Sequence, residues 1–458
     1  MKSDTIAAIA TAVADAGIGV IRISGPEAFV VADRIFKPKN GSARVSEMES
    51  HTVHYGYIAD GEETIDEVLL LVMRAPATYT REDVVEIDCH GGTVVMRRLL
   101  DVVLANGARP AEPGEFTKRA FLNGRIDLSQ AEAVIDVINA KSDLALRSSV
   151  SQLKGSVLAR IREIRAEILH ALAFLEAALD DPEHYSLDGT QAELKEQIEG
   201  AKEEVHRLLL TADNGKILKE GINTVIVGKP NVGKSTLLNT LIGEERAIVT
   251  EIAGTTRDIL SEQIRIGGLT LHVIDTAGIR STEDTIEKLG VERALEHMEQ
   301  ADLVICMVDS SDELDENDEE ILRAIRDKRA IVLRNKTDLE TKTTEEDLRK
   351  KTDQPVLSVS AKEKQGMDEL EDLITSMFID GKISFNDEVY ITNARQKTAL
   401  AEADQSLQNV LDSIENGMPE DFWTIDIMSA YEELGAVIGE SVEDDLVDAV
   451  FRDFCMGK

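Results

Sequence analysis

Positive charge is what this 458-residue sequence has least of: 50 Lys and Arg stand against 87 Asp and Glu, a formal net charge of −37. Such a chain repels phosphate backbones, which excludes non-specific nucleic-acid binding driven by counterion release. The deficit is uneven, because residues 1–120 carry 13 basic and 18 acidic residues whereas residues 385–458 carry 4 and 17. We therefore expect any RNA substrate to approach the N-terminal third, or to be contacted through another protein.

Cysteine, proline and long apolar runs are also scarce. The three cysteines, Cys89, Cys306 and Cys455, lie far apart without metal-ligand spacing, which predicts free thiols in a reducing cytosol rather than a disulfide framework. Nine prolines and no low-complexity run argue against long disordered linkers. No apolar stretch approaches membrane-spanning length. The run Ile6 to Ala14 imitates a signal peptide, but Asp4 lies in what should be its basic region, so a cytoplasmic protein is expected.

One stretch, residues 228–235, fits the phosphate-binding pattern G-x-x-x-x-G-K-S between a predicted strand at 224–227 and a predicted helix at 236–241. A strand that leads through a glycine loop into a helix directs backbone N–H groups and the positive helix end at one anion. Lys234 would reach the β- and γ-phosphates, and the Ser235 hydroxyl would bind Mg²⁺. The candidate nucleotide contacts here are Asn231, Val232, Gly233, Lys234, Ser235 and Thr236.

Two further signals follow in the order expected of a nucleotide hydrolase. The polar stretch 254–258 suits a mobile switch loop whose Thr256 supplies a second hydroxyl to Mg²⁺. A strand at 271–274 leads to Asp275, which can hold a Mg²⁺-bound water, and to Gly278, whose N–H can bond the γ-phosphate. The candidate contacts of these segments are Thr250, Glu251, Ile252, Ala253, Gly254, Thr255, Thr256, Asp275, Thr276, Ala277 and Gly278.

The base is predicted by residues that follow two later strands, at 330–333 and 356–359. The Asp338 carboxylate can accept from N1–H and from the exocyclic amine of guanine, whereas adenine has no such amine, so a buried carboxylate would reject it. The Ala361 N–H is placed for guanine O6. The candidate base contacts are Asn335, Lys336, Asp338, Ser360, Ala361 and Lys362. Together with the phosphate loop, these signals predict a GTPase domain.

Catalysis is expected to be unusual, because Ile279 occupies the position where many GTPases carry a Gln that orients the attacking water. Glu287 and Arg280, in the polar stretch that follows, are our candidates for that work, although Glu287 alone could be a solvated helix residue. The Asn231 amide oxygen can ligate a monovalent cation beside the phosphates, which would supply the charge that an arginine finger brings elsewhere. A loop-stabilising side chain is the alternative role for Asn231.

The length and the patterning predict a multidomain α/β and α fold. Residues 1–120 alternate as strands of an α+β domain, and residues 216–380 form the P-loop GTPase domain, a mostly parallel doubly wound sheet. Helical spacing marks residues 128–179, about 190–210, 394–414 and 423–452. We expect residues 121–215 and 381–458 to build one helical domain into which the GTPase domain is inserted.

Motifs at both ends of the chain, combined with the nucleotide motifs, resemble the MnmE (TrmE) family of tRNA uridine-modification GTPases. They are residues 19–25 (GVIRISG), 82–86 (EDVVE) with 90–92 (HGG), 113–123 (PGEFTKRAFLN) and the C-terminal Cys-x-Gly-Lys. The resemblance covers the whole chain. One departure is Met456, where isoleucine is commoner, an exchange between apolar residues that should be tolerated.

The resemblance implies a homodimer formed through a folate-binding-like N-terminal domain and a flavoprotein partner, MnmG (GidA), that uses FAD and NADH. In a heterotetramer or larger complex, the two would install a carboxymethylaminomethyl-type group at C5 of the tRNA wobble uridine. The carbon would come from a 5-formyl- or 5,10-methylene-type tetrahydrofolate, with glycine or ammonium as the amine donor. The tRNA would be contacted largely through the complex.

On matching positions, the resemblance assigns roles to individual residues. Folate contacts fall on Arg22, Glu82, Arg119 and Lys458, with Cys455 nearby and with the choice between Lys118 and Arg119 left open. K⁺ ligands fall on Asn231, Thr250, Ile252 and Thr255, and Mg²⁺ ligands on Ser235 and Thr256. Glu287 matches a general base that acts through a bridging water, and Arg280 an accessory switch residue.

A ribosome-assembly or translation GTPase, which switches RNA association without modification chemistry, is the alternative function. Its nucleotide motifs would look the same, but the acidic charge and the lack of a basic RNA-binding appendage argue against it. A membrane-associated GTPase is disfavoured too, because the sequence has no amphipathic basic helix and Met456-Gly457 is not the aliphatic pair of a prenylation signal.

Overall fold

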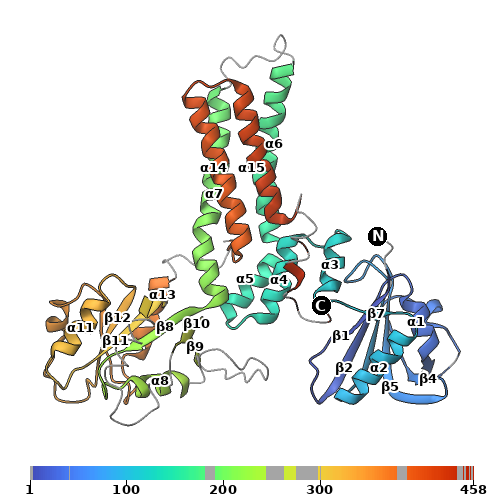
Figure 1. Ribbon diagram of the computed structural model, residues 1–458, viewed down its shortest axis with the longest axis horizontal. Helices are drawn as coiled ribbons and strands as arrows, with labels where there is room; N and C mark the ends of the chain where they lie inside the picture. The colour runs from blue at the N-terminus through green and yellow to red at the C-terminus, as the bar shows by residue number, and fades with distance from the viewer. Residues whose placement is uncertain are drawn as a thin grey trace. The chain divides into compact units, whose positions relative to one another are not determined.

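The structure is a computed structural model that describes residues 4–40, 42–180, 191–243, 262–274, 298–299, 301–378, 389–440, 447, 450–452, 454 and 457. The side chains of residues 174, 177–180 and 213 are outside this description. The chain divides into two compact units, shown in Figure 1. The first contains Met1–Ile138, Val150–Glu204 and Ala399–Lys458, and the second contains Asn139–Ser149 and Val205–Thr398.

The first unit contains a seven-stranded sheet in the order β3-β4-β5-β6-β2-β1-β7. Neighbouring strands in this sheet are antiparallel, except β1 and β7, which are parallel. The strands are β1 (Ile6–Ile9), β2 (Ala16–Ser24), β3 (Phe36–Pro38), β4 (Thr52–Asp60), β5 (Glu63–Met73), β6 (Val84–Gly91) and β7 (Arg109–Pro110). Helices α1 (Ala28–Ile35) and α2 (Thr93–Ala105) pack their apolar residues on one face of this sheet, and a short 3₁₀ helix covers Val45–Glu47. Helix α3 (Glu115–Leu122) follows β7.

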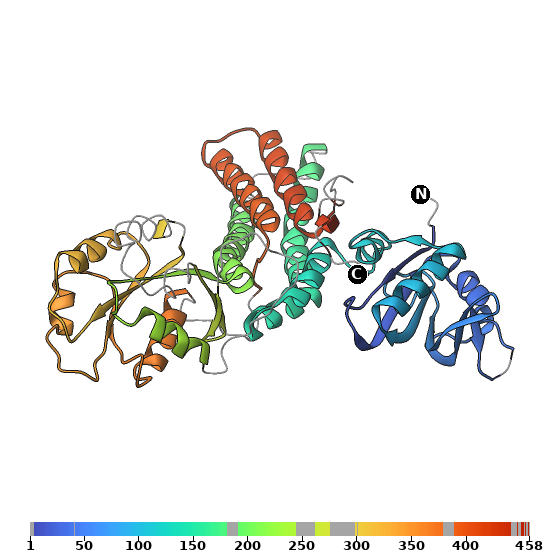
Figure 2. The same cartoon turned by 60° about the horizontal axis from the view of Figure 1, so that its bottom comes forward.

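The first unit also contains a helical bundle. Along the chain, the helices are α4 (Leu128–Asn139), α5 (Asp143–Leu153), α6 (Ser156–Asp180), α7 (Gln191–Glu220), α14 (Ala394–Glu415) and α15 (Glu420–Ile438). Most of α5, the part of α7 from Val205 and the first residues of α14 belong to the second unit. Both views show α6, α14, α15 and the first half of α7 side by side (Figures 1 and 2). The pair α6 and α7 is far in sequence from the pair α14 and α15. Ion pairs join them, such as Lys202 with Asp404 at 3.4 Å.

The sequence predicted continuous helical spacing from 128 to 179, and this prediction was wrong in detail. The segment forms three helices. Ser142, whose hydroxyl accepts from the Ala145 N–H at 3.1 Å, opens α5 after a break, and Gly155 ends it with a φ of +91°. A second difference is that α7 continues to Glu220, whereas the helix was predicted to end near residue 210. Within this extension, Gly215 lets the helix approach the Ile391 carbonyl closely.

The second unit is built on a six-stranded sheet in the order β13-β12-β11-β8-β10-β9. All neighbours are parallel except the edge strand β9, which runs antiparallel to β10. The strands are β8 (Ile222–Val227), β9 (Glu262–Ile266), β10 (Leu269–Val273), β11 (Leu303–Asp309), β12 (Ala330–Asn335) and β13 (Val356–Ser358). The helices are α8 (Lys234–Gly243), α11 (Glu316–Ala324), α12 (Glu345–Arg349) and α13 (Met367–Phe378).

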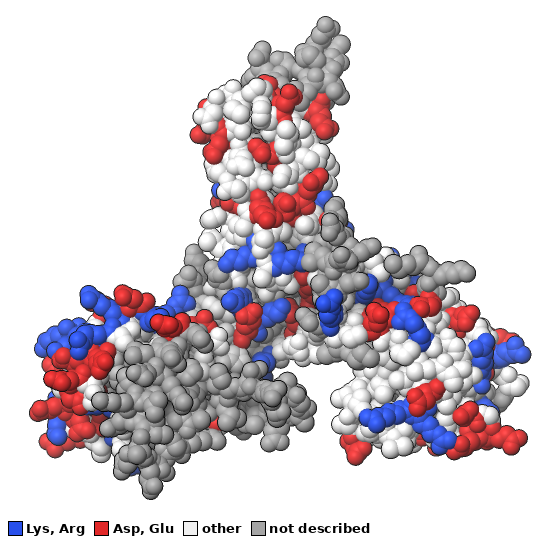
Figure 3. Space-filling view, in the orientation of Figure 1, with Lys and Arg blue, Asp and Glu red and all other residues white. Residues whose placement is uncertain are grey.

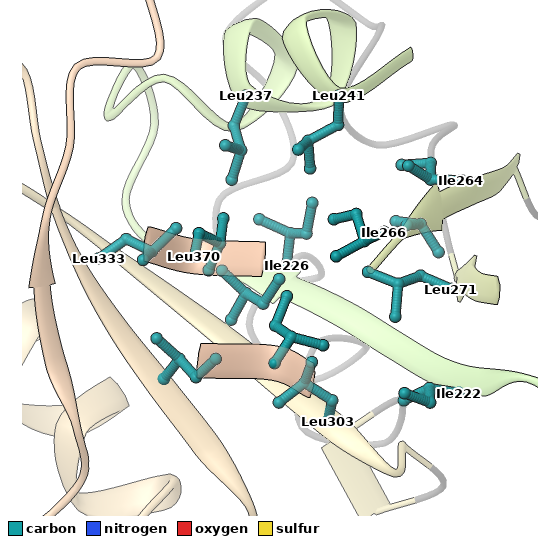
Figure 4. Packing of buried hydrophobic residues seen from close by; sticks show 14 of the residues in the cluster. Ile222, Ile226, Leu237, Leu241, Ile264, Ile266, Leu271, Leu303, Leu333 and Leu370 are labelled. Carbon is teal, nitrogen blue, oxygen red and sulfur yellow. The ribbon is translucent and has the colours of Figure 1, made fainter. Parts of the chain in front are cut away.

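Two apolar clusters lie on opposite faces of this sheet. On one face, Leu237 and Leu241 of α8 and Leu370 of α13 pack against Ile226 and Leu271, as Figure 4 shows. On the other face, α11 and α12 cover the second set of side chains, so β11 is buried along its whole length. The multidomain α/β and α fold that the sequence predicted is thereby confirmed. Among the described residues, no helix has the length and apolarity needed to cross a membrane.

Candidate nucleotide-binding site

The phosphate-binding pattern lies where β8 ends and α8 begins, at the carboxyl edge of the parallel strands. Gly228 has a φ of +147°, and an added Cβ would lie 2.4 Å from the Met307 carbonyl oxygen. Gly233 has a φ of +104°, and its Cβ would lie 2.3 Å from the Asn335 amide nitrogen. Both positions therefore require glycine, for backbone conformation and for space. The loop is pressed against β11 and β12, which fixes its path.

Lys234, the first residue of α8, lies over this loop. Its ammonium donates to the Gly228 and Lys229 carbonyl oxygens, each at 2.7 Å. Burial lowers the pKa of Lys234 below its usual range. An anion placed against the loop would stabilise the charged ammonium and raise this pKa. Ser235 and Thr236 follow on the first turn of α8, at the positive end of the helix.

Asn231 adopts the left-handed conformation, with a φ of +62°, and its side chain is exposed. Few residues other than glycine tolerate this conformation, and asparagine is one of them. Asn231 is thus an exposed residue within the phosphate loop, and the cation-ligand role predicted for its amide oxygen stays a prediction.

A partly buried set of ion pairs that the sequence reasoning missed anchors the loop. The Lys229 ammonium lies 2.6 Å from Asp318 and 2.9 Å from Asp315, at the start of α11. Burial acts to lower the pKa of Lys229, but hydrogen bonds to Asp318 and Asp315 outweigh it and raise the pKa above its usual range. Asp315 and Asp318 also form the capping box of α11. The three-residue spacing of Asp315 and Asp318 was the available sequence signal, but it predicts the start of a helix and does not identify Lys229 as their partner.

Asn335, at the end of β12, joins the phosphate loop to the predicted base-binding loop. Its amide nitrogen donates to the Val232 carbonyl at 2.7 Å, and its amide oxygen accepts from the Ala361 N–H at 3.0 Å. All three residues are buried. The Ala361 N–H, predicted to face guanine O6, thus bonds Asn335 in this structure. One carboxamide sets the separation of the two loops.

Lys336 is held by a second missed residue, Asp309, at the end of the neighbouring strand β11. The Lys336 ammonium lies 2.5 Å from the Asp309 carboxylate, and the Lys336 backbone has a φ of +63°. Burial acts to raise the pKa of Asp309, but Lys336 and the Ser311 hydroxyl and N–H lower it below its usual range. Asp309 pairs in register with Asn335. A carboxylate at the end of an otherwise apolar predicted strand was the sequence signal that could have identified Asp309 as a site residue.

Asp338 is exposed, contrary to the buried carboxylate that the sequence reasoning assumed. It accepts from the Ser360 hydroxyl at 2.6 Å, and this hydrogen bond lowers its pKa, so it is a carboxylate at neutral pH. The predicted role of Asp338 in rejecting the wrong base would therefore require that the bound base itself bury this carboxylate, and it stays a prediction. Thr240 of α8 donates to the Ala361 carbonyl at 2.8 Å, which ties the base loop to the helix after the phosphate loop. Lys362 is exposed beside it.

The remaining predicted nucleotide and catalytic positions lie outside the described residues. They are Thr250, Glu251, Ile252, Ala253, Gly254, Thr255, Thr256, Asp275, Thr276, Ala277, Gly278, Arg280 and Glu287. Cys455 and Lys458 of the tail lie outside them as well. Among the residues that are described, the structure thus brings together the phosphate loop, Asn335 to Asp338, and Ser360 to Lys362.

A separate set of predicted residues gathers in the first unit. Arg119 of α3 contacts Glu82 at 3.0 Å and Glu115 at 2.9 Å, and the Glu82 carboxylate also accepts from Ser24 at 2.8 Å. Arg22 of β2 pairs instead with Glu86 at 2.6 Å. Of the predicted folate contacts, Glu82 and Arg119 therefore touch each other and Arg22 does not join their ion pair.

Arg22 nevertheless lies at a junction with the C-terminal tail. Its guanidinium donates to the Gly457 carbonyl at 3.1 Å and lies within 6 Å of the Tyr79 and Phe116 ring centroids, at 5.8 and 5.6 Å. Gly457 has a φ of +84°, and its Cβ would lie 2.4 Å from the Ile9 carbonyl oxygen, so this position also requires glycine. The glycine of the Cys-x-Gly-Lys tail is packed against β1 and β2.

Comparisons with known proteins agree with these motifs. Residues 128–455 match the family model of the MnmE helical domain, and residues 5–125 match that of the GTP-binding protein TrmE N-terminus. A protein of Lachnoclostridium phytofermentans, named tRNA modification GTPase MnmE, is 58% identical over 458 residues and 100% of both chains. A protein of the same name from Clostridioides difficile is 48% identical over 99% of both chains.

A solved structure of Era from Aquifex aeolicus is 29% identical to this chain. Its TM-score is 0.27, over 40% of this chain and 66% of its own. The strand order of the second unit, and not that score, identifies the doubly wound nucleotide-binding fold here.

Proposed function

Since this chain belongs to the MnmE family of tRNA modification GTPases, we propose a division of labour in which its second unit hydrolyses GTP and its first unit serves modification of the tRNA wobble uridine. The product would carry a carboxymethylaminomethyl-type group at C5. A tetrahydrofolate derivative would supply the carbon, and a flavoprotein of the MnmG kind, with FAD and NADH, would be the partner.

The observation that carries the GTP part is the Asn335 link. It holds a glycine-dependent phosphate loop and a guanine-type carboxylate loop at one edge of the sheet. Lys234 would bind the β- and γ-phosphates, and Ser235 with Thr256 would hold Mg²⁺, which neutralises charge on the transferring group. Asp338 would accept from the guanine N1–H and amine, while Asn335 keeps that carboxylate at a fixed distance from the loop.

For the hydrolytic step, we propose that Glu287 positions the attacking water through a bridging water and that Arg280 assists. K⁺ held by Asn231, Thr250, Ile252 and Thr255 would supply positive charge beside the phosphates. The exposed, left-handed Asn231 supports this assignment, because a strained backbone conformation at a phosphate loop is typical of functional residues.

For the modification step, we propose that Arg22, Glu82, Arg119 and Lys458 contact the folate and that Cys455 lies near it. The Arg22 hydrogen bond to Gly457 supports this proposal, because it anchors the residue next to Lys458, two positions after Cys455, against the sheet. Arg119 is favoured over Lys118 at the folate site, since its guanidinium already pairs with Glu82.

A homodimer is proposed from the uncovered face of the N-terminal sheet. Helices α1 and α2 cover one face, whereas Val53, Tyr55 and Leu69 are exposed on the other, on β4 and β5. Tyr55 and Leu69 are register partners, so these side chains form one apolar strip that a second copy can bury. The net charge of −37 supports a complex in which the flavoprotein makes much of the tRNA contact.

The deciding experiment is mass spectrometry of nucleosides in bulk tRNA from cells that lack this protein. We expect loss of C5-substituted wobble uridines, restored by the intact gene and not by a Cys455→Ser copy. Rescue by the Ser copy would reduce Cys455 to a packing role. An unchanged nucleoside profile would contradict the modification function and favour a ribosome-assembly or translation switch.

The cation part is tested separately. GTP turnover of the purified chain is measured in K⁺ and in Na⁺, for the native chain and for Asn231→Ala. We expect faster turnover in K⁺ and loss of this preference in the variant. Equal turnover of the native chain in both salts would overturn the K⁺ proposal while leaving GTP hydrolysis in place.

A further inference from the structure

Helix α15 presents an apolar strip that the bundle does not use. Phe422, Ile425 and Met428 are 49%, 66% and 36% exposed, and they recur every three residues, on one side of the helix. Met418, 38% exposed in the preceding turn, extends the strip by one helical step. The opposite side of α15 supplies the bundle core, with Trp423, Ile427, Ala430 and Leu434. The strip is therefore additional to the apolar surface that folding requires.

The charge around this strip has one sign. Asp421 and Glu432 are exposed at its two ends, Asp426 is half-buried on the same helix, and Glu433 bonds Glu402 of α14. The sequence has no Lys or Arg from Thr398 to Phe451, although Asp and Glu recur throughout. Figure 3 shows the result: the upper part of the bundle carries red and white surface and no blue.

Ion pairs across the bundle neutralise part of this charge, such as Glu415 with Lys195 at 2.7 Å, whereas Glu433 faces a second carboxylate. Burial raises the pKa of Glu433, and a hydrogen bond to Glu402 of α14 raises it further, since two carboxylates compete for one proton. Burial also raises the pKa of Asp426. Cations from outside this segment would relieve both. RNA is excluded as the occupant because its phosphates would be repelled. A protein that presents Lys and Arg around an apolar strip fits both the shape and the charge.

We propose that the strip of Met418, Phe422, Ile425 and Met428 is the docking surface for the flavoprotein partner, through a helix whose apolar side is flanked by Lys and Arg. This inference rests on the proposed function, which names that partner, and it adds the place of contact. Methionines at both ends suit such a surface, because they adapt to the side chains they meet. The acidic rim would speed association and select a basic partner.

The test measures binding of the full-length chain to the purified flavoprotein partner, by titration at low and at high salt. The double variant Phe422→Ser/Ile425→Ser should weaken binding by about tenfold or more, because central apolar anchors dominate interface energetics. The matched control is Val94→Ser/Leu210→Ser, two residues that are 79% and 65% exposed on α2 and α7. The control should bind as the native chain does, and GTP turnover of both variants without the partner should be unchanged.

Charge gives a second readout. Asp421→Asn/Glu432→Gln should reduce the salt dependence of binding while retaining the apolar contact. If the native chain does not bind the flavoprotein, the proposed partner is wrong, and this inference is overturned with it. Equal binding by the native chain and the Phe422→Ser/Ile425→Ser variant overturns the docking surface alone. If that variant instead dissociates a dimer in sedimentation, the occupant is a second copy of this chain, and the inference is again overturned.

Discussion

Asn335 links the predicted phosphate-binding loop to the predicted base-binding loop, because its carboxamide bonds both Val232 and Ala361. Asn335→Ala would leave a buried carbonyl and a buried N–H unpaired, at a cost of about 1–3 kcal/mol each. We expect weaker GTP and GDP binding, by tenfold or more, and a lower melting temperature. Titration with a fluorescent guanine nucleotide measures the first effect.

The matched control for Asn335 is Thr337→Ala. Thr337 lies two residues away and donates its backbone N–H to the Val359 carbonyl, a bond that alanine keeps. The affinity of the Thr337→Ala variant for guanine nucleotides should stay within about twofold of the native value. Equal affinity in Asn335→Ala would show that the two loops are positioned independently of this amide.

The cysteines give a prediction about chemical reactivity. Burial raises the pKa of the Cys89 thiol from 9.0 to about 11 and that of Cys306 from 9.0 to about 12. Only the thiolate reacts with iodoacetamide, so both should resist alkylation near pH 8 in the native chain and react after unfolding. Peptide mass spectrometry reads this out, and Cys455 is the remaining candidate for native labelling. Labelling of Cys89 or Cys306 in the native chain would contradict their burial.

The same pKa shifts have a defined effect on stability. Because the folded state favours the protonated thiol, the contribution of Cys89 is complete below pH 9 and is lost as the pH rises towards about 11. Cys89→Ala should therefore flatten the decline in stability across this alkaline range. Urea unfolding at two pH values above and below pH 9 measures the difference.

The sequence motifs assigned candidate nucleotide contacts, which stay predictions, but they did not reveal the residues that hold these loops in place. Gly228, Lys234 and Asn335 were predicted because phosphate and base chemistry demand fixed spacings within one loop. Asp318 was missed, because its partner Lys229 is 89 residues away and only the fold brings them together. The exposure of Asp338 was missed for a related reason: a motif predicts contacts with a ligand and carries no information about burial.

At the element scale, α7 contains a matched pair of glycines. Gly200 has open space around its missing side chain, whereas a Cβ on Gly215 would lie 2.1 Å from the Ile391 carbonyl oxygen. Gly200→Ala should stabilise the chain by roughly 0.5–1 kcal/mol, because alanine loses less backbone entropy in a helix. Gly215→Ala should destabilise it by roughly 1–3 kcal/mol, through forced displacement of the backbone.

Thermal unfolding of the two α7 variants measures both signs in one experiment. Each variant serves as the control for the other, since the substitution and the helix are the same. Stabilisation by Gly215→Ala would contradict the close approach of α7 to Ile391.

Strands and helices were predicted where their periodicity is strong, and their boundaries were not. The buried run 303–309 became β11 because an unbroken apolar stretch suits a strand covered on both faces. The single helical segment predicted at 128–179 became three helices, because regular spacing of apolar residues does not show where one helix ends and the next begins. Gly155 was the local signal for one of these breaks.

At the scale of the whole molecule, the two ends of the GTPase segment, near Thr211 and Ile391, lie next to each other. The Ile391 N–H donates to the Thr211 hydroxyl at 3.2 Å, so the ends of the intervening segment meet. Insertions with adjacent ends fold independently more readily than others. Residues 212–392 expressed alone should therefore be folded and should bind GTP, as circular dichroism and nucleotide titration will show.

The isolated segment should nevertheless melt at a lower temperature than the same portion in the full chain. Leu144 of α5, which belongs to residues 139–149, packs against the core of the second unit and close to Gly268. Its removal exposes apolar surface. Leu144→Ala in the full chain should lower the melting temperature in the same direction, and an unstructured isolated segment would contradict the independence of the insertion.

The contact between Arg22 and Gly457 spans 435 positions of sequence. A ribosome releases the chain from its N-terminal side, so the sheet that carries Arg22 can fold long before its tail partner has been synthesised. Contacts of such separation form late and carry a large loop-closure cost. The folate site that we propose there can consequently be completed only after synthesis reaches Gly457, so a chain interrupted shortly before this residue would lack it.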